Sequence, residues 1–378
     1  MLYKRYLICL LFLFYAYFPW QVVSGDTIQD VAATIDSVKL KFGPDHRISV
    51  FNINYTFQND TLILTGDVID PAAQSTLINQ LSTIPKITII DSITVLPDSS
   101  VIGTPKGIIC ISVAQLRRGP DVDQEMISQA IMGMEIKILK KSGYFLYCQM
   151  EDGYLGWMMK SSVAGGDDAF IKKWRAKPKL IVTALYGTVR QTHSDDAMPV
   201  SDLVRGAILA KVDSRRGWYQ VELPDGRLGY VRKNLVMDTE KWKQQFPPTA
   251  DAIVKTAETV YGVPYLWGGI SIKGFDCSGF TQSTFKFNGI QLPRDANMQV
   301  NEGDAVPLDE NLSNLKPGDL LFFGRTPERI THVALYISNG QFIHSDGYVH
   351  INSFNPVHEN YSEYRLMGLQ AARRIIKP

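Results

Sequence analysis

Charge of one sign, cysteine and long apolar runs are all scarce in this chain of 378 residues. Its formal net charge is +1, and the balance moves to about −1 if Lys4 and Arg5 are removed with an N-terminal segment. This balance gives no support for nucleic-acid binding or for a strongly basic membrane-binding surface. A hydrophobic content of 45% with 20% charged residues is typical of globular proteins, and the length predicts two to four domains.

The longest apolar run lies at the N-terminus and is short for a membrane span. Two basic residues precede the run Tyr6–Trp20, and the small residues Ser24 and Gly25 follow it. A membrane anchor needs roughly 20 apolar residues, so this order favours a cleavable secretory signal over residues 1–25. We therefore expect an exported protein of the periplasm or cell envelope, with no transmembrane segment in the mature chain.

The few cysteines also limit the chemistry. Cys110 and Cys148 fall in one β-rich stretch and are candidates for a disulfide, which export would permit. Cys277 is then left over as a free thiol. Structural zinc usually takes four ligands at short spacings such as C-x-x-C, and the sequence has no such spacing. We expect no metal and no cofactor.

Residues 26–100 predict a small α+β unit. Helical spacing covers residues 28–40 and 70–84, and strand-like patterns cover 48–58, 61–66 and 87–96. From Leu62 onward the pattern resembles the BON domain of bacterial envelope proteins. A plain packing domain is the alternative, and the sequence leaves open what this unit binds.

An internal repeat occupies residues 105–165 and 175–240. Its copies end in Gly153-Tyr-Leu-Gly-Trp-Met158 and Gly226-Arg-Leu-Gly-Tyr-Val231. Short alternating strands between glycine turns predict two small barrels of ~60 residues each. The pattern resembles bacterial SH3 domains, for which a role as spacer or cell-wall adhesion module is the plain alternative.

A glycine-rich aromatic loop after Tyr265 leads into Asp276-Cys277-Ser278-Gly279, and a helix-like run follows to Phe287. Asp276 is the expected N-cap, which places Cys277 in the first helical turn. Unpaired amides and the helix dipole there favour a thiolate, so we expect the thiol pKa to fall below its usual value of about 8.5. A small buried side chain is the alternative for a lone cysteine.

Two histidines lie on a predicted β-hairpin, Ile330–Ile337 and Gln341–Ser345. We expect Thr331, Val333, Leu335 and Ile337 to face the core. A two-residue Asn-Gly turn would pair Ser338 with Gln341 and put His332 and His344 on opposite faces. A three-residue loop, 338–340, pairs Ile337 with Gln341 and puts both rings on one face. We expect the three-residue loop, in which the two histidines are diagonal neighbours, ~7–8 Å apart at the backbone. A cysteine nucleophile needs a base, and the base needs an orienting group. Cys277, His332 and His344 can fill these roles. A metal site is the rival use.

Five segments in this order resemble the NlpC/P60 family of bacterial cell-wall cysteine peptidases. They are Tyr-x-Trp-Gly-Gly, Asp-Cys-Ser-Gly-Phe, Pro-Gly-Asp-Leu-x-Phe-Phe, Thr-His-Val-Ala-Leu-Tyr-Ile and Phe-Ile-His-Ser. The likeness covers residues 248–378. It implies a papain-like α+β domain with Cys277 as nucleophile, His332 as base and His344 as the third residue. The fold class is then multidomain α+β, with this catalytic domain behind two SH3-like barrels and the BON-like unit.

The two SH3-like units narrow the likeness to the γ-D-glutamyl-L-diamino acid endopeptidases, also called the dipeptidyl-peptidase VI type. In that subgroup the first SH3-like domain closes the pocket and holds the free amine of L-alanine. By resemblance, the substrate-binding residues are Glu125, Tyr154, Tyr265, Trp267, Asp276 and Ser278. The chain departs from the subgroup at Ala296, where a serine often follows Pro-Arg-Asp, so one substrate hydrogen bond is put in doubt.

The resemblance implies hydrolysis of the bond between γ-D-glutamate and the diamino acid in peptidoglycan stem peptides with a free N-terminal L-alanine. The backbone amides near Cys277, with help from Tyr265, would hold the oxyanion. Three alternatives stay open: an endopeptidase on intact peptidoglycan, a non-catalytic wall-binding scaffold, and a membrane-bound stress or adhesion protein built on residues 26–100. The sequence does not distinguish diaminopimelate from lysine, nor does it give the oligomeric state.

Overall fold

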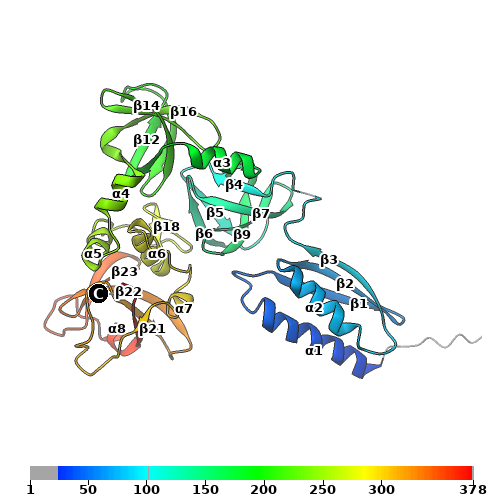
Figure 1. The fold of residues 1–378 in the computed structure, drawn as a ribbon. Coiled ribbons are helices and arrows are strands. Elements are labelled where there is room, and N and C mark those ends of the chain that lie inside the picture. The colour runs from blue at the N-terminus through cyan, green and yellow to red at the C-terminus, as the bar shows by residue number, and fades with distance from the viewer. Residues whose placement is uncertain (1–23, 101, 377–378) are drawn as a thin grey trace, which may run out of the picture. The chain divides into compact units, whose positions relative to one another are not determined.

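The computed structural model of the protein describes residues 24–100 and 102–376. The chain divides into two compact units, one of residues up to 44 with 50–95, the other of 45–49 with all residues from 96 onward. Figure 1 shows their elements. The predicted signal segment lies almost wholly outside the described residues. Within them, no helix is both long and apolar enough to span a membrane.

The first unit has the order helix-strand-strand-helix-strand, and its three strands form one sheet. Its elements are α1 (Gly25–Phe42), β1 (Phe51–Gln58), β2 (Thr61–Val68), α2 (Pro71–Leu81) and β3 (Thr88–Val95). The central strand β2 runs antiparallel to β1 and parallel to β3. Val31 and Leu77 of the helices and Leu62 and Leu64 of β2 are fully buried in one core. Each element lies within three residues of its predicted range.

The second unit starts with two seven-stranded antiparallel sheets that have the same strand order. The first sheet has the order β10-β4-β7-β8-β9-β5-β6. From the equivalent edge, the second sheet has the order β17-β11-β14-β15-β16-β12-β13, so each strand of one sheet has a counterpart in the other. The first comprises β4 (Lys106–Ile109), β5 (Val113–Arg117), β6 (Met126–Ile131), β7 (Glu135–Ser142), β8 (Phe145–Gln149), β9 (Leu155–Met159) and β10 (Val163–Gly166). The second comprises β11 (Lys179–Val182), β12 (Tyr186–Arg190), β13 (Pro199–Val204), β14 (Ile208–Arg215), β15 (Trp218–Glu222), β16 (Leu228–Arg232) and β17 (Val236–Asp238).

Helix α3 (Asp168–Ala176) connects the two sheets, and a short 3-10 turn precedes the last strand of each, at Lys160–Ser162 and Lys233–Leu235. The disulfide that the sequence allowed is absent, because Cys110 and Cys148 are both free thiols. Both thiols are buried and each contacts a carbonyl oxygen, Cys148 Sγ that of Leu146 at 3.5 Å and Cys110 Sγ that of Ser161 at 3.7 Å.

The rest of the second unit is a six-stranded sheet with helices, ordered β20-β25-β21-β22-β23-β24. Its helices are α4 (Thr239–Gln245), α5 (Ala250–Glu258), α6 (Cys277–Phe287), α7 (Ala296–Gln299) and α8 (Glu363–Gly368). Its strands are β20 (Asp304–Ala305), β21 (Leu320–Gly324), β22 (Ile330–Ser338), β23 (Gln341–Asp346), β24 (Tyr348–Ser353) and β25 (Leu369–Arg374). A small hairpin, β18 (Ile270–Ser271) and β19 (Gly274–Phe275), precedes α6.

Helix α6 packs on β22 and β23. Both faces of β22 are buried, which corrects the expectation of a single core face. Val333 and Leu335 lie in the core that includes α6, whereas Ala334 and Tyr336 lie in a second core on the opposite face. Thr331, which was expected inside, is exposed near the start of the strand. A sheet covered on both faces shows no simple alternation in its sequence.

Candidate active site

Cys277 is the first residue of α6, and Asp276 caps the helix as predicted. The Asp276 carboxylate is almost saturated with donors. Oδ1 accepts from the Gly279 amide at 2.6 Å and from Nη1 of Arg294 at 3.0 Å, and Oδ2 accepts from the Gly268 amide at 2.9 Å and from Nη2 of Arg294 at 2.5 Å. Little acceptor capacity remains for a substrate ammonium. The Asp276 carboxylate therefore mainly holds the conformation of the loop that carries Cys277.

Arg294 ties this loop to the first seven-stranded sheet. Its side chain is 1% exposed, and besides Asp276 it donates to the hydroxyl oxygens of Ser278 at 3.0 Å and Ser128 at 2.9 Å. A guanidinium this deeply buried needs a carboxylate partner and further acceptors, and it has both. The sequence comparison included Arg294 only as part of the Pro-Arg-Asp segment and gave it no role. Its role depends on Ser128, 166 positions earlier in the chain, so no local signal marks it.

The hairpin that carries the histidines closes by a different turn from the one predicted. Asn339 (φ 50°) and Gly340 (φ 79°) form a two-residue turn, and Ser338 pairs with Gln341. The expected three-residue loop is therefore wrong. A β-bulge between Tyr336 and Ser338 adds one residue to β22 and restores the pairing of Leu335 with Ile343. The bulge reverses the effect of the short turn, so His332 and His344 share a face after all.

A chain of hydrogen bonds runs from His332 through His344 to Asn352 of β24. His332 Nε2 lies 3.0 Å from His344 Nδ1, His344 Nε2 lies 2.9 Å from Oδ1 of Asn352, and Nδ2 of Asn352 donates to the Asn360 carbonyl at 3.2 Å. These bonds assign the tautomers. Since the Asn352 oxygen must accept, His344 carries its proton on Nε2, His332 carries its proton on Nε2, and Nδ1 of His332 is left as a base.

Asn352 is a residue that the sequence reasoning missed. It lies on the strand next to His344, in the stretch Tyr348-Val-His-Ile-Asn352. Polar residues alternating with apolar ones there were a usable signal. Which of them meets His344 depends on the register of β24, in which His350 is opposite His344 and Asn352 is opposite Phe342.

Burial keeps the cysteine and both histidines neutral. Desolvation is the main cause that raises the pKa of Cys277 to about 11; the charge of Asp276 adds to it, and backbone hydrogen bonds from Val333 and Ser278 oppose it. Desolvation also lowers the pKa of His332 well below 6.5 and that of His344 to about 4. The expected fall in the cysteine pKa is therefore wrong, because burial outweighs the helix N-terminus. No hydrogen bond between Cys277 and His332 occurs among the described residues, and such contacts often tighten only with substrate.

Two of the other predicted residues, Glu125 and Tyr154, lie in the loops of the first sheet and contact residues near the Cys277 loop. Glu125 accepts a hydrogen bond from the exposed Trp267 indole at 2.8 Å and pairs with Arg118 at 2.7 Å. Tyr154 is buried, and its hydroxyl donates to Oδ2 of Asp295 at 3.1 Å. Tyr265 is half-buried. Burial, and after it the charge interaction with Cys277, raise the pKa of its phenol to about 12, so the phenol stays protonated.

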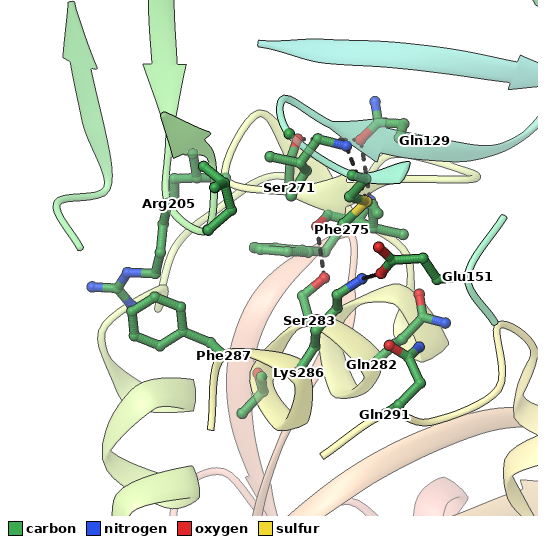
Figure 2. Close-up of a pocket in the computed structure, with 18 of the residues that line it drawn as sticks. Gln129, Glu151, Arg205, Ser271, Phe275, Gln282, Ser283, Lys286, Phe287 and Gln291 are labelled. Atoms are coloured by element: carbon green, nitrogen blue, oxygen red, sulfur yellow. Dashed lines mark hydrogen bonds and ion pairs between the residues drawn. The ribbon is translucent and has the colours of Figure 1, made fainter. Parts of the chain in front are cut away.

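A cavity of about 210 Å³ lies where the first sheet, the second sheet and α6 meet, and Cys277, His332 and His344 do not line it. Figure 2 shows Gln129 beside Ser271, and Lys286 of α6 reaching Glu151. Gln129 Oε1 accepts from the Ile270 amide and from the Ser271 hydroxyl, both at 3.1 Å. These contacts join the first sheet to the hairpin that precedes α6, so the cavity belongs to the packing that supports the Cys277 loop.

Comparison with known proteins agrees with this arrangement. The sequence profile of the NlpC/P60 family matches residues 262–371, and that of the bacterial dipeptidyl-peptidase SH3 domain matches residues 116–163. The chain is 33% identical to a gamma-D-glutamyl-L-lysine dipeptidyl-peptidase of Bacillus cereus, over 58% of this chain and 66% of that protein. It is 30% identical to the protein of the same name from Bacillus subtilis, over 61% of this chain and 75% of that protein.

Among solved structures, an NlpC/P60 family protein from Bacillus cereus superposes with a TM-score of 0.61 at 25% identity, over 72% of this chain and all of that one. The likeness therefore includes most of the second unit and not the catalytic domain alone. With the family profile over the Cys277 and histidine segments, and a relative matched over three quarters of its length, the chain belongs to the NlpC/P60 family.

Proposed function

We propose that the protein is a cysteine peptidase that hydrolyses the bond between γ-D-glutamate and the diamino acid in peptidoglycan stem peptides with a free N-terminal L-alanine. The observation that carries the proposal is the hydrogen-bond chain from Asn352 through His344 to His332. Cys277 begins α6, which packs on the strand of His332, and the backbone of Val333, the residue after His332, hydrogen-bonds the Cys277 thiol. The names of two relatives support the proposed scissile bond, since both are gamma-D-glutamyl-L-lysine dipeptidyl-peptidases.

The reaction follows from the neutral resting state. Because the pKa of Cys277 is raised and that of His332 is lowered, the pair rests as thiol and imidazole. As Sγ bonds to the γ-carbonyl carbon, the thiol proton moves to Nδ1 of His332, whose ring is held through Nε2 by His344. His332 then gives that proton to the leaving amine of the diamino acid, and a thioester remains. Water adds to the thioester with the same base, which releases the dipeptide and the thiol.

The oxyanion needs donors that the fold does not already use. In the first turn of α6, the Gly279 amide is taken by the Asp276 side chain and the Phe280 amide by the Asp276 carbonyl. The amide of Cys277 is a remaining donor, since helix N-termini leave their first amides unpaired. The protonated Tyr265 phenol supplies a second donor beside Cys277.

The proposed domain division places two SH3-like barrels at residues 105–165 and 175–240 before a catalytic domain at 248–378. The shared strand order of the two sheets supports it. For residues 26–100, the helix-strand-strand-helix-strand order supports a BON-like unit. Export to the periplasm or cell envelope fits a substrate that derives from the cell wall.

The test is mass spectrometry of defined peptides after incubation with the protein. L-Ala-γ-D-Glu-diaminopimelate and L-Ala-γ-D-Glu-L-Lys are compared with their N-acetyl forms and with intact sacculi. We expect cleavage of the free peptides to be at least roughly 10- to 100-fold more efficient than cleavage of their N-acetyl forms, with sacculi left intact. The faster of the two free peptides identifies the diamino acid. Clearing of sacculi, or equal cleavage of free and acetylated peptides, would replace the proposal by an endopeptidase on intact peptidoglycan. Failure to cut any peptide would favour a wall-binding scaffold.

A further inference from the structure

The short segment Asp45–Ser49 belongs to the second unit although it connects α1 to β1. It lies against the turn between β8 and β9, where the Arg47 carbonyl accepts from the Leu155 amide at 2.7 Å. That turn carries Tyr154, whose hydroxyl points at Asp295. The segment is therefore fixed beside one of the residues proposed to border the amine of the substrate.

The Arg47 side chain connects this segment to Asp295 and Asn297, before and within α7. Nη1 donates to Oδ2 of Asp295 and to Oδ1 of Asn297, both at 2.7 Å. Asp45 holds the same guanidinium from behind, through Nε at 2.9 Å and Nη2 at 2.6 Å. The side chain is only 23% exposed, and its fork is almost fully used. The Arg47 guanidinium is thus held in one orientation by hydrogen bonds, unlike a solvent-exposed surface arginine.

Arg47 and Tyr154 donate to the same oxygen of Asp295. They approach it from segments far apart in the chain and together fix the orientation of the carboxylate. Oδ1 of Asp295 has no hydrogen-bond partner among the described residues. Two carboxylates, Asp45 and Asp295, flank one guanidinium, so the cluster keeps a net charge of −1, which suits an ammonium group.

We infer that Arg47 is a positioning residue for recognition of the substrate amine, acting through Asp295 and Tyr154, and that Asp45–Ser49 closes the end of the site beyond that amine. The inference rests on the proposed function. It means that a segment preceding both SH3-like sheets helps the enzyme to prefer released peptides over stems whose amine is blocked. A lysine would keep the charge but could not bridge Asp45, Asp295 and Asn297 at once.

The test measures kcat and KM for the free-amine tripeptide and for its N-acetyl form. We expect Arg47→Ala to raise KM for the free peptide about tenfold with kcat within about twofold, and to lower the preference for the free amine about tenfold. Arg47→Lys should fall between. Arg175→Ala, which removes another arginine paired with a carboxylate (Glu135), is the matched control and should change neither constant.

A double-mutant cycle separates positioning from general stability. If Arg47 acts through Asp295, then Arg47→Ala should change KM less than about twofold in an Asp295→Asn background. An unchanged preference for the free amine in Arg47→Ala, or equal kcat losses for both peptides together with a lower melting temperature, would overturn the inference. If the wild-type protein cuts neither peptide, the proposed function fails instead.

Discussion

The two seven-stranded sheets have one topology and very different side chains at equivalent positions. Arg117 and Arg190 are equivalent, since each follows a bulge and donates Nη1 to a carbonyl oxygen seven residues later, at 2.6 and 2.7 Å. The residue after that carbonyl is Glu125 in the first sheet and Met198 in the second. Glu125 holds Trp267, whereas Met198 is 68% exposed.

The turns before β9 and β16 show the same contrast. Gly153 (φ 85°) and Gly226 (φ 87°) adopt the same left-handed conformation, which a side chain would strain. The next residue is Tyr154 in the first sheet and Arg227 in the second. Tyr154 reaches Asp295, but Arg227 donates to the Cys110 carbonyl at 2.8 Å and so joins the second sheet to the first. The fold supplies equivalent positions, and the side chains at those positions decide what each sheet contacts.

The residues proposed for catalysis lie in neither seven-stranded sheet, so the largest loss of turnover should come from a substitution outside both sheets. Cys277→Ala should lower turnover by more than about 1000-fold, because a methyl group cannot form the thioester. Cys148→Ala, a buried cysteine of the first sheet, is the control and should retain turnover in the protein that stays folded. Turnover is measured by peptide release. If the Cys277→Ala protein kept more than about 0.1% of the activity, Cys277 could not be the nucleophile.

The resting protonation state of Cys277 gives the next largest effect. With the pKa of Cys277 raised to about 11, only the small thiolate fraction reacts with iodoacetamide, and that fraction grows as pH rises. The alkylation rate of Cys277 should increase roughly tenfold per pH unit between pH 7 and 10. Mass spectrometry separates it from Cys110 and Cys148, whose pKa values burial also raises. A flat rate from pH 5 to 9 would instead indicate a preformed thiolate–imidazolium pair.

Substitution of Asn352 tests whether this residue serves the catalytic base, which would change kcat, or substrate binding, which would change KM. Asn352→Ala removes the acceptor that fixes the proton of His344 on Nε2, so the tautomer of His332 is no longer assigned. We expect kcat to fall roughly 10- to 100-fold with KM nearly unchanged. Asn352→Gln keeps the amide and should recover part of the loss. Should KM rise and kcat stay constant, Asn352 would belong to substrate binding and not to the base.

How far the sequence predicted the site depends on the distance between partners in the chain. The N-cap Asp276 and the helix after Cys277 were predictable because capping is local. The hairpin shows the limit. Asn339-Gly340 strongly indicates a two-residue turn, and only the bulge at Ile337, which no local pattern marks, restores the common face of the histidines.

The contacts that the sequence missed join distant segments. Arg294 meets Ser128 and Arg47 meets Asp295, 166 and 248 positions apart. The pKa of Cys277 was mispredicted for a related reason, since desolvation depends on how the whole second unit packs around the thiol. The helix order and strands of the first unit, in contrast, follow local periodicity and were predicted to within a few residues.

Exchanging equivalent residues tests directly whether recognition belongs to the first sheet. Glu125→Met introduces the residue of the second sheet and should lower kcat/KM for the free-amine peptide roughly 10- to 100-fold, about 1.5–3 kcal/mol for a charge-assisted contact. The reciprocal Met198→Glu should leave kcat/KM within about twofold. Steady-state kinetics of both variants on free and acetylated peptides is the measurement. Equal effects of the two exchanges would show that the sheets do not differ in function.

The smallest effects should appear at the β18–β19 hairpin, which both sheets hold. The first sheet holds it through the buried Gln129, which accepts from the Ile270 amide and the Ser271 hydroxyl, and the second through the exposed Tyr186, whose hydroxyl donates to the Ile272 carbonyl at 2.8 Å.

Gln129→Leu leaves a buried amide without an acceptor and should lower the free energy of unfolding by about 1–3 kcal/mol, whereas Tyr186→Phe should cost about 0.5–1 kcal/mol because water can replace an exposed hydroxyl. Urea unfolding of the whole chain measures both. We expect Gln129→Leu also to slow turnover a few-fold, since the hairpin leads directly into the Cys277 loop, and Tyr186→Phe to leave turnover unchanged. If Tyr186→Phe proved the more damaging of the two, the second sheet would have to be counted among the elements that shape the site.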